Sequence, residues 1–266
     1  MSFLKINSTN IYYEVHENIL AEDTLFIHGN LASHQWWHPC LTILENQNQN
    51  KQHKGKMILV DWRGCGESSA PCDFSEMKMG NLANDLNLII DHLKLQKVHL
   101  VGHSTGGFIA LNMVIQRPEL FSKILLLDSV GAKGVQLNPE IEAAFDQMQK
   151  DKELTAAVIG STIYNLNSED TFFKEVIVED AFNAVKNLGK SILYALKDVD
   201  VREDLKKINN PTLVLHGEHD DLLPKEDSQK LASLLSNARY MEIPGQGHCC
   251  NYENPKLFVK YLNEFL

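Results

Sequence analysis

The sequence VGHSTGG at residues 101–107 fits the pattern G-x-S-x-G, with Ser104 between Gly102 and Gly106. The short apolar, β-branched run before it predicts a buried strand, and residues 108–115 after it predict a helix. Such a turn forces the serine into a strained backbone conformation, and the glycines leave room for the neighbouring strand and helix. The pattern therefore predicts a hydroxyl held above a sheet at a helix N-terminus, where backbone N–H groups face a developing anion.

Strands and helices alternate on both sides of this turn. Further strands are expected at 11–16, 24–29, 56–61, 123–128, 212–217 and 238–243, and helices at 34–46, 80–94, 225–235 and 254–265. This alternation predicts an α/β fold with a mainly parallel, doubly wound sheet. We expect one core made of residues 1–130 and 206–266.

Residues 131–205 interrupt the alternation, because they contain helical segments and no convincing strand. One helix should begin at Pro139 with Asn138 as its N-cap, and others are expected at 153–165, 169–176 and 179–197. An insertion at this point follows the carboxyl end of a strand. We therefore expect a helical cap, or lid, over the sheet edge where ligands bind in open α/β folds.

Composition excludes several classes of protein. The net charge is −10, and without a basic run this argues against binding nucleic acid or an anionic membrane. The first residues do not resemble a secretory signal, and no apolar run is long enough to span a membrane. The five cysteines, an odd number, are expected to be free thiols in a reducing compartment, which predicts a cytoplasmic protein. Nothing in the sequence selects an oligomeric state.

A serine hydroxyl is a poor nucleophile unless a base activates it and an acid orients that base. His248 follows the strand expected at 238–243, and Asp220 follows the strand expected at 212–217. Both side chains should therefore reach the carboxyl edge of the sheet, where Ser104 is expected. Asp128 ends another strand and is an alternative acid.

Four motifs now occur in order along nearly the whole chain: HGN at 28–30, DWRGCGES at 61–68, GHSTGG at 102–107, and GEHD at 217–220 with GH at 247–248. With them the chain resembles the α/β-hydrolase superfamily, in its capped, esterase-like branch. The helical insert is the least specific part of this resemblance.

The resemblance implies a role for each motif. Ser104 is the nucleophile, Asp220 the acid and His248 the base, and the backbone N–H groups of Thr105 and Asn30 form an oxyanion hole. Leu31 is an alternative to Asn30 as the second donor. The DWRGCGES motif is interpreted as a structural brace, in which an arginine pairs with carboxylates or carbonyls.

No cofactor is predicted. The sequence contains neither a dinucleotide-binding nor a phosphate-binding glycine motif. His34 and His38 stand four residues apart, but no third ligand has metal-site spacing, so no metal is predicted. The cluster at His216, His219 and Asp220 is already explained by the hydrolase interpretation.

The function expected from the resemblance is that of a serine carboxylesterase, of class EC 3.1.1, acting on a small-molecule ester. The insert has many apolar side chains and no cluster of basic ones, Lys133 and Arg202 being isolated at its ends, so small to medium uncharged acyl groups are expected. Trp36 and Trp37 are expected at the pocket mouth, with core packing as the alternative. The same triad also serves lactonases, C–C bond hydrolases and perhydrolases, and some relatives are ligand-binding or signalling proteins.

Overall fold

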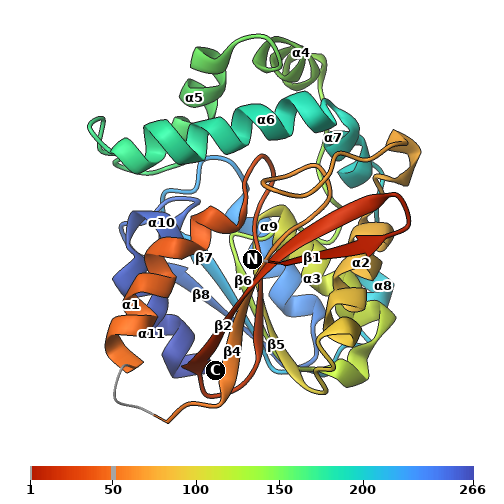
Figure 1. Cartoon of the computed structure of the whole chain (residues 1–266), viewed down its shortest axis with the longest axis vertical. Helices are drawn as coiled ribbons and strands as arrows, with labels where there is room; N and C mark the ends of the chain where they lie inside the picture. The colour runs from red at the N-terminus through yellow and green to blue at the C-terminus, as the bar shows by residue number, and fades with distance from the viewer. Residues whose placement is uncertain (1, 49–51) are drawn as a thin grey trace.

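The computed structural model describes residues 2–48 and 52–266. Its centre is an eight-stranded sheet in the order β1-β2-β4-β3-β5-β6-β7-β8 (Figure 1). The strands are β1 (Ser2–Ile6), β2 (Thr9–Leu20), β3 (Thr24–Ile27), β4 (Gly55–Asp61), β5 (Val98–His103), β6 (Phe121–Leu127), β7 (Thr212–Gly217) and β8 (Ala238–Ile243). β2 runs antiparallel to both of its neighbours, β1 and β4, and the other five pairs are parallel. The α/β fold with a mainly parallel sheet is therefore confirmed.

Helices cover both faces of this sheet (Figure 1). One face carries α1 (His38–Asn48), α10 (Cys250–Glu253) and α11 (Pro255–Phe265), and the other carries α2 (Met79–His92), α3 (Thr105–Gln116) and α9 (Lys225–Leu234). Short 3-10 helices η1 (His34–Trp37), η2 (Phe74–Glu76) and η3 (Pro118–Leu120) lie in the connections. No described helix has both the length and the apolar character needed to cross a bilayer.

Each central strand is apolar on both faces, because both faces are covered. Phe26 and Val101 point into the layer beneath α1 and α11, whereas Leu25 and Leu100 point into the layer beneath α2 and α3. All four side chains are at most 1% exposed. The sheet is therefore covered on both faces, and the loops that follow the parallel strands all leave it at the edge formed by the carboxyl ends of these strands.

Residues 131–205, all described, contain helices and no strand. They comprise α4 (Pro139–Met148), α5 (Lys152–Ser161), the π-helix η4 (Phe173–Ile177), α6 (Val178–Leu188), α7 (Ser191–Leu196) and α8 (Arg202–Leu205). In Figure 1, α4, α5 and α6 form a layer beyond one edge of the sheet. Asn187 in α6 donates to the carbonyl of Gly64 at 3.3 Å, and Ser33 donates to Asp180. This segment therefore packs on loops that follow β3 and β4.

Several element boundaries differ from those expected. Residues 2–6 form a strand that was not predicted, and the segment 34–46 is a 3-10 turn followed by α1, with Pro39 inside the first turn. Residues 179–197 form two helices, because Gly189 has φ +52° and ends α6. The helix predicted from Pro139 is confirmed, and Asn138 accepts from the N–H of Ile141 at 2.8 Å.

The structure also tests the predictions for Trp37 and for the cysteines. Trp37 is fully buried and packs against Phe26 and Phe258, so its expected place at a pocket mouth is wrong. All five cysteines are free, as expected; Cys72 is exposed and the other four are buried. Burial raises the pKa of each of these four thiols: Cys40, Cys65, Cys249 and Cys250.

Candidate active site

Ser104 lies between β5 and α3 in a strained conformation, with φ 54° and ψ −122°. A Cβ atom added at Gly102 would lie 2.6 Å from the carbonyl oxygen of Gly106, and one at Gly106 would collide with the backbone of Ile27 and His28. Side chains are therefore excluded at both glycines, as the sequence predicts. The surrounding backbone determines this turn, because the N–H of Ser104 donates to the carbonyl of Leu127 at 3.0 Å.

His248 and Asp220 meet at the carboxyl edge of the sheet. His248 Nδ1 lies 2.8 Å from Asp220 Oδ2, and the other carboxylate oxygen accepts from the N–H groups of Leu222 and Leu223 at 2.8 and 3.0 Å. Burial alone would raise the pKa of Asp220, but these hydrogen bonds, with that to His248 first, lower it below its usual value. Asp220 is therefore a carboxylate suited to hold a histidine by its Nδ1–H.

His103, the residue before Ser104, joins the loop that carries His248 to the turn that carries Ser104. Its Nε2 lies 2.9 Å from the carbonyl oxygen of His248, and the two rings are 4.8 Å apart. Burial, followed by the charge of His248, lowers the pKa of His103 to about 3. A neutral ring must donate from Nε2 to this carbonyl, so His103 links the loop that carries Ser104 to the loop that carries His248.

Asp128 lies behind this pair and contacts a different set of atoms. Its Oδ1 accepts from the N–H of Gly217 at 2.8 Å and lies 3.3 Å from His216 Nδ1. Burial, and then the charge of Asp220, raises its pKa well above the usual value. Asp128 is therefore placed to support the Asp220 loop, whereas Asp220 is the carboxylate that contacts His248.

The loop after β3 carries the candidate oxyanion donors. His28 Nδ1 donates to the carbonyl of Gly29 at 2.8 Å, since burial lowers the pKa of His28 to about 4 and keeps the ring neutral. The peptide bond between Gly29 and Asn30 is planar and trans, so its C=O and N–H point in opposite directions. The hydrogen bond from His28 to the Gly29 carbonyl therefore also sets the direction of the Asn30 N–H. The N–H of Leu31 is already donated to Asn30 Oδ1 at 2.9 Å.

The segment 131–205 reaches the site through aromatic side chains. Phe172 stacks on Tyr252 with ring centroids 6.3 Å apart, Tyr252 contacts Trp36 at 5.4 Å, and Trp36 contacts His103 at 6.2 Å. Trp36 is only 3% exposed. A continuous row of rings therefore runs from this segment to the residue before Ser104.

Tyr164 adds a second contact with the loop that carries His248. A Cβ atom added at Gly247 would lie 2.7 Å from Cβ of Tyr164, and the Tyr164 ring stacks on His219 with centroids 4.3 Å apart. Of the basic residues at the ends of the segment, Arg202 is bound to Asp200 by an ion pair of 2.6 Å, and Lys133 is exposed.

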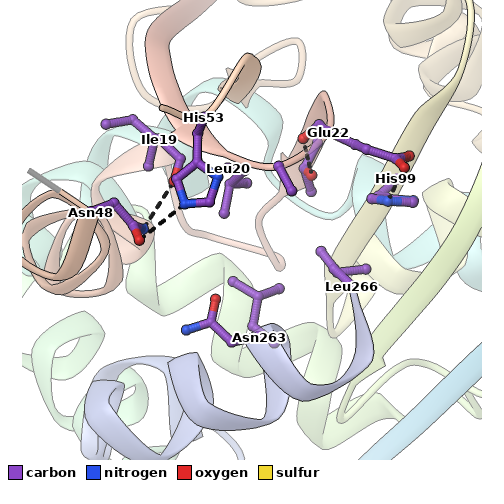
Figure 2. Close-up of a pocket in the computed structure, with 11 residues that line it drawn as sticks. Ile19, Leu20, Glu22, Asn48, His53, His99, Asn263 and Leu266 are labelled. Carbon is purple, nitrogen blue, oxygen red and sulfur yellow. Dashed lines mark hydrogen bonds and ion pairs between the residues drawn. The ribbon is translucent and has the colours of Figure 1, made fainter. Parts of the chain in front are cut away.

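Two pockets lie away from this site. One, of about 240 Å³, lies near the amino ends of β3 and β5 and is lined by residues that include Thr24 and His99. Figure 2 shows His99 and other residues that line it. The other, of about 660 Å³, lies between η2, α3 and α7. The described residues that line them do not include Ser104 or His248. Because ligands of open α/β folds bind at the carboxyl edge, neither pocket is the expected substrate site.

Known proteins resemble the chain along nearly its whole length. The model of the alpha/beta hydrolase fold family matches residues 25–158 and 172–255. YugF of Bacillus subtilis (strain 168), an uncharacterized hydrolase, is 26% identical over 271 residues, covering 98% of this chain and 96% of that protein. RutD of Pseudomonas savastanoi pv. phaseolicola, a proposed carbamate hydrolase, is 27% identical over 270 residues, covering 96% and 98%.

A solved structure agrees with this match. The esterase EaEST from Exiguobacterium antarcticum superposes with a TM-score of 0.84 at 23% identity, over 99% of this chain and 98% of that one. At this identity the likeness concerns the fold alone. The family match, however, spans most of the sequence and includes every loop described above. The chain therefore belongs to the alpha/beta hydrolase family.

Proposed function

We propose that this protein is a serine hydrolase that cleaves carboxylic esters through Ser104, His248 and Asp220. The observation that carries the proposal is the arrangement of these groups: a strained serine at a helix N-terminus, and a histidine held by a buried carboxylate 2.8 Å away on the adjoining loop. Their order along the chain is that of the α/β-hydrolase triad. The fold family supports hydrolysis, and the ester is our choice among its substrates.

In the proposed reaction, Ser104 Oγ attacks the acyl carbonyl carbon and its proton passes to His248 Nε2. Asp220 stabilises the resulting imidazolium through Nδ1–H. The negative charge on the former carbonyl oxygen is stabilised by the backbone N–H groups of Asn30 and Thr105. The alcohol leaves with the proton from His248. Water, deprotonated by His248, then attacks the acyl-enzyme. The bond to Ser104 Oγ breaks, Oγ takes the proton back from His248, and the carboxylic acid is released.

We further propose that residues 131–205 act as a cap over the site and exclude water from it. The aromatic row from Phe172 to His103 and the contact of Tyr164 with the His248 loop support this assignment. Arg202 is bound to Asp200, so the cap offers no free cation of its own there for a charged acyl group. An uncharged acyl chain of small or medium size fits this environment best.

A carbamate is the second candidate substrate, because RutD is similar over nearly the full length of both chains. The same nucleophile attacks a carbamate carbonyl, but the acyl group then carries nitrogen in place of carbon. Comparison of matched esters and carbamates with one leaving group separates the two.

The first test concerns the nucleophile. Ser104→Ala should abolish turnover of p-nitrophenyl esters while leaving the fold intact, because the hydroxyl makes no contribution to the core. A fluorophosphonate should label the wild-type chain at Ser104 in a one-to-one ratio, which peptide mass spectrometry identifies. Labelling of another serine, or full turnover by the variant, would refute the assignment.

A further inference from the structure

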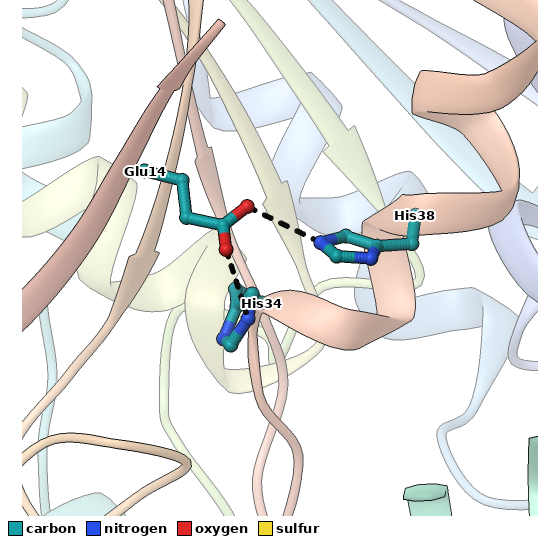
Figure 3. A group of neighbouring side chains, drawn as sticks. All are labelled: Glu14, His34 and His38. Atoms are coloured by element: carbon teal, nitrogen blue, oxygen red, sulfur yellow. Dashed lines mark hydrogen bonds and ion pairs between the residues drawn. The ribbon is translucent and has the colours of Figure 1, made fainter. Parts of the chain in front are cut away.

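Outside the candidate active site, the fold brings together a carboxylate and three imidazoles that the sequence separates. Figure 3 shows His34 and His38, from the start of η1 and of α1, pointing at the carboxylate of Glu14 on β2. His34 Nε2 lies 3.5 Å from Glu14 Oε1, and His38 Nε2 lies 3.3 Å from Glu14 Oε2. His16 Nε2 also lies 3.0 Å from Oε2. We call Glu14, His34 and His38 the β2–η1 cluster.

The spacing of these atoms suits a small divalent cation. Zinc binds imidazole nitrogen and carboxylate oxygen at about 2.0–2.1 Å in a tetrahedron, which places neighbouring ligand atoms roughly 3.3 Å apart. The two measured nitrogen-to-oxygen separations, 3.3 and 3.5 Å, are close to this value. All three ligand atoms lie within 4.8 Å of one another, so a modest rotation of the side chains completes the geometry.

The surroundings of His34 point to a cation at its Nε2. Its Nδ1 lies 2.8 Å from Asp61 Oδ2, while its Nε2 faces the Glu14 carboxylate, so both ring nitrogens face acceptors. Two carboxylates beside one ring favour positive charge there. With Nδ1–H donated to Asp61, Nε2 carries either a proton or a metal ion toward Glu14, and metal binding displaces that proton. In metal sites, the ring nitrogen that does not bind the metal commonly donates its N–H to a carboxylate, as Nδ1 of His34 would donate to Asp61.

We propose that the β2–η1 cluster binds one divalent transition metal ion of the zinc class through Glu14, His34 and His38. Two imidazoles and a carboxylate leave a fourth position, which water fills. Tyr12 donates to Glu14 Oε1 at 2.6 Å and orients the carboxylate, as Asp61 orients His34. The ion reaches the site from solvent, because the His38 side chain is 32% exposed while that of His34 is 4% exposed.

The position of the site suggests a bracing role. The ion joins β2 to η1 and α1, and Asp61, which orients His34, also accepts from the backbone N–H groups of His34 and Glu67 at 2.6 and 3.0 Å. His34 lies a few residues after the loop that carries Asn30. Binding of the ion therefore restrains the chain just after the proposed oxyanion loop. The ion takes no part in the proton transfers at Ser104.

The test is metal binding by the full chain, stripped with a chelator and carrying Cys72→Ser so that the exposed thiol does not compete. Calorimetric titration with ZnCl₂ should show one ion per chain, and Co²⁺ should give the intense visible bands of a four-coordinate nitrogen and oxygen site. His38→Ala and Glu14→Gln should each weaken binding by more than the roughly 10-fold to 100-fold that loss of an outer-shell partner costs. Both variants should lose the Co²⁺ bands.

The matched control is His92→Ala, which removes an exposed histidine at the end of α2 and should leave metal affinity unchanged. Circular dichroism verifies that each variant is folded. The proposal is overturned if the stripped wild-type chain binds no Zn²⁺. It is equally overturned if folded His38→Ala and Glu14→Gln bind Zn²⁺ as tightly as the control, because the ion then lies elsewhere, for example at Asp128, His216 and Asp220. Neither outcome depends on esterase activity.

Discussion

Asp220 and Asp128 are buried carboxylates at the ends of neighbouring strands, and only the contacts of their side chains distinguish them. Asp220 contacts His248 Nδ1 at 2.8 Å, whereas Asp128 accepts from the backbone of Gly217. We therefore expect Asp220→Asn to lower kcat on the order of 10⁴-fold, the loss seen in serine-protease triads, because the histidine then takes the wrong tautomer. Asp128→Asn should keep most of the rate. Steady-state kinetics on one ester decides, and the opposite ranking would make Asp128 the acid.

The same pair yields a prediction about pH and stability. Burial raises the pKa of Asp128 above its unfolded value of 3.8, so the folded state favours the protonated form. Its unfavourable effect on stability is absent below that unfolded value and grows as the pH rises toward the folded pKa. Asp128→Asn cannot ionise, so its Tm should exceed that of the wild type by more at about pH 8 than at about pH 5. A difference in Tm that does not change with pH would contradict the raised pKa.

At the scale of elements, side-chain signals at helix ends made some boundaries predictable. The cap at Asn138 and the proline after it marked the start of α4 correctly. The break at Gly189 was not predicted, because apolar residues continue at helical spacing on both sides of it. The strand at Ser2–Ile6 was also missed, since it forms only by pairing with β2, a contact that no local pattern encodes.

Gly189 makes the break between α6 and α7 testable. Its φ of +52° and ψ of −134° are unfavourable for other residues, although a Cβ atom would find no atom nearer than 3.5 Å. Gly189→Ala should therefore lower the free energy of unfolding by about 1–3 kcal/mol through backbone strain alone. Gly80→Ala is the matched control: Gly80 is the second residue of α2, and alanine should stabilise the chain there by up to about 0.5–1 kcal/mol. Urea unfolding measures the change in the free energy of unfolding for both variants. A change of the same sign in both would contradict the role of backbone strain at Gly189.

At the scale of the whole molecule, the order of motifs was enough to predict the fold and to propose which residues meet at one sheet edge. Parallel strands present their carboxyl ends together, so the sequence alone predicts that Ser104, Asp220 and His248 lie near one another. The β2–η1 cluster was not predictable in this way. His34 and His38 stand four residues apart in the sequence, but Glu14 lies on a strand whose neighbour in the sheet depends on the full strand order.

Substrate size also belongs to the scale of the whole molecule, because in our proposal residues 131–205 and the core form the site together. Each methylene group that fits contributes up to about 0.8 kcal/mol, or about fourfold in kcat/KM. We expect kcat/KM to rise from acetyl through butyryl esters and to fall where the cap blocks the chain. Acetyl, butyryl, hexanoyl and decanoyl p-nitrophenyl esters test this, with a dicarboxylate mono-ester as the comparison. A preference for the mono-ester would indicate a cationic anchor such as Lys133.

The distribution of the cysteines makes the native chain ready for fluorescent labelling. Thiolates, not thiols, react with maleimides, and burial both shields Cys40, Cys65, Cys249 and Cys250 and disfavours their ionisation. A dye should therefore attach at Cys72, two residues before Phe74, which lines one pocket with Tyr194 of α7. Without any substitution, its emission would report in real time whether residues 131–205 move when an ester binds.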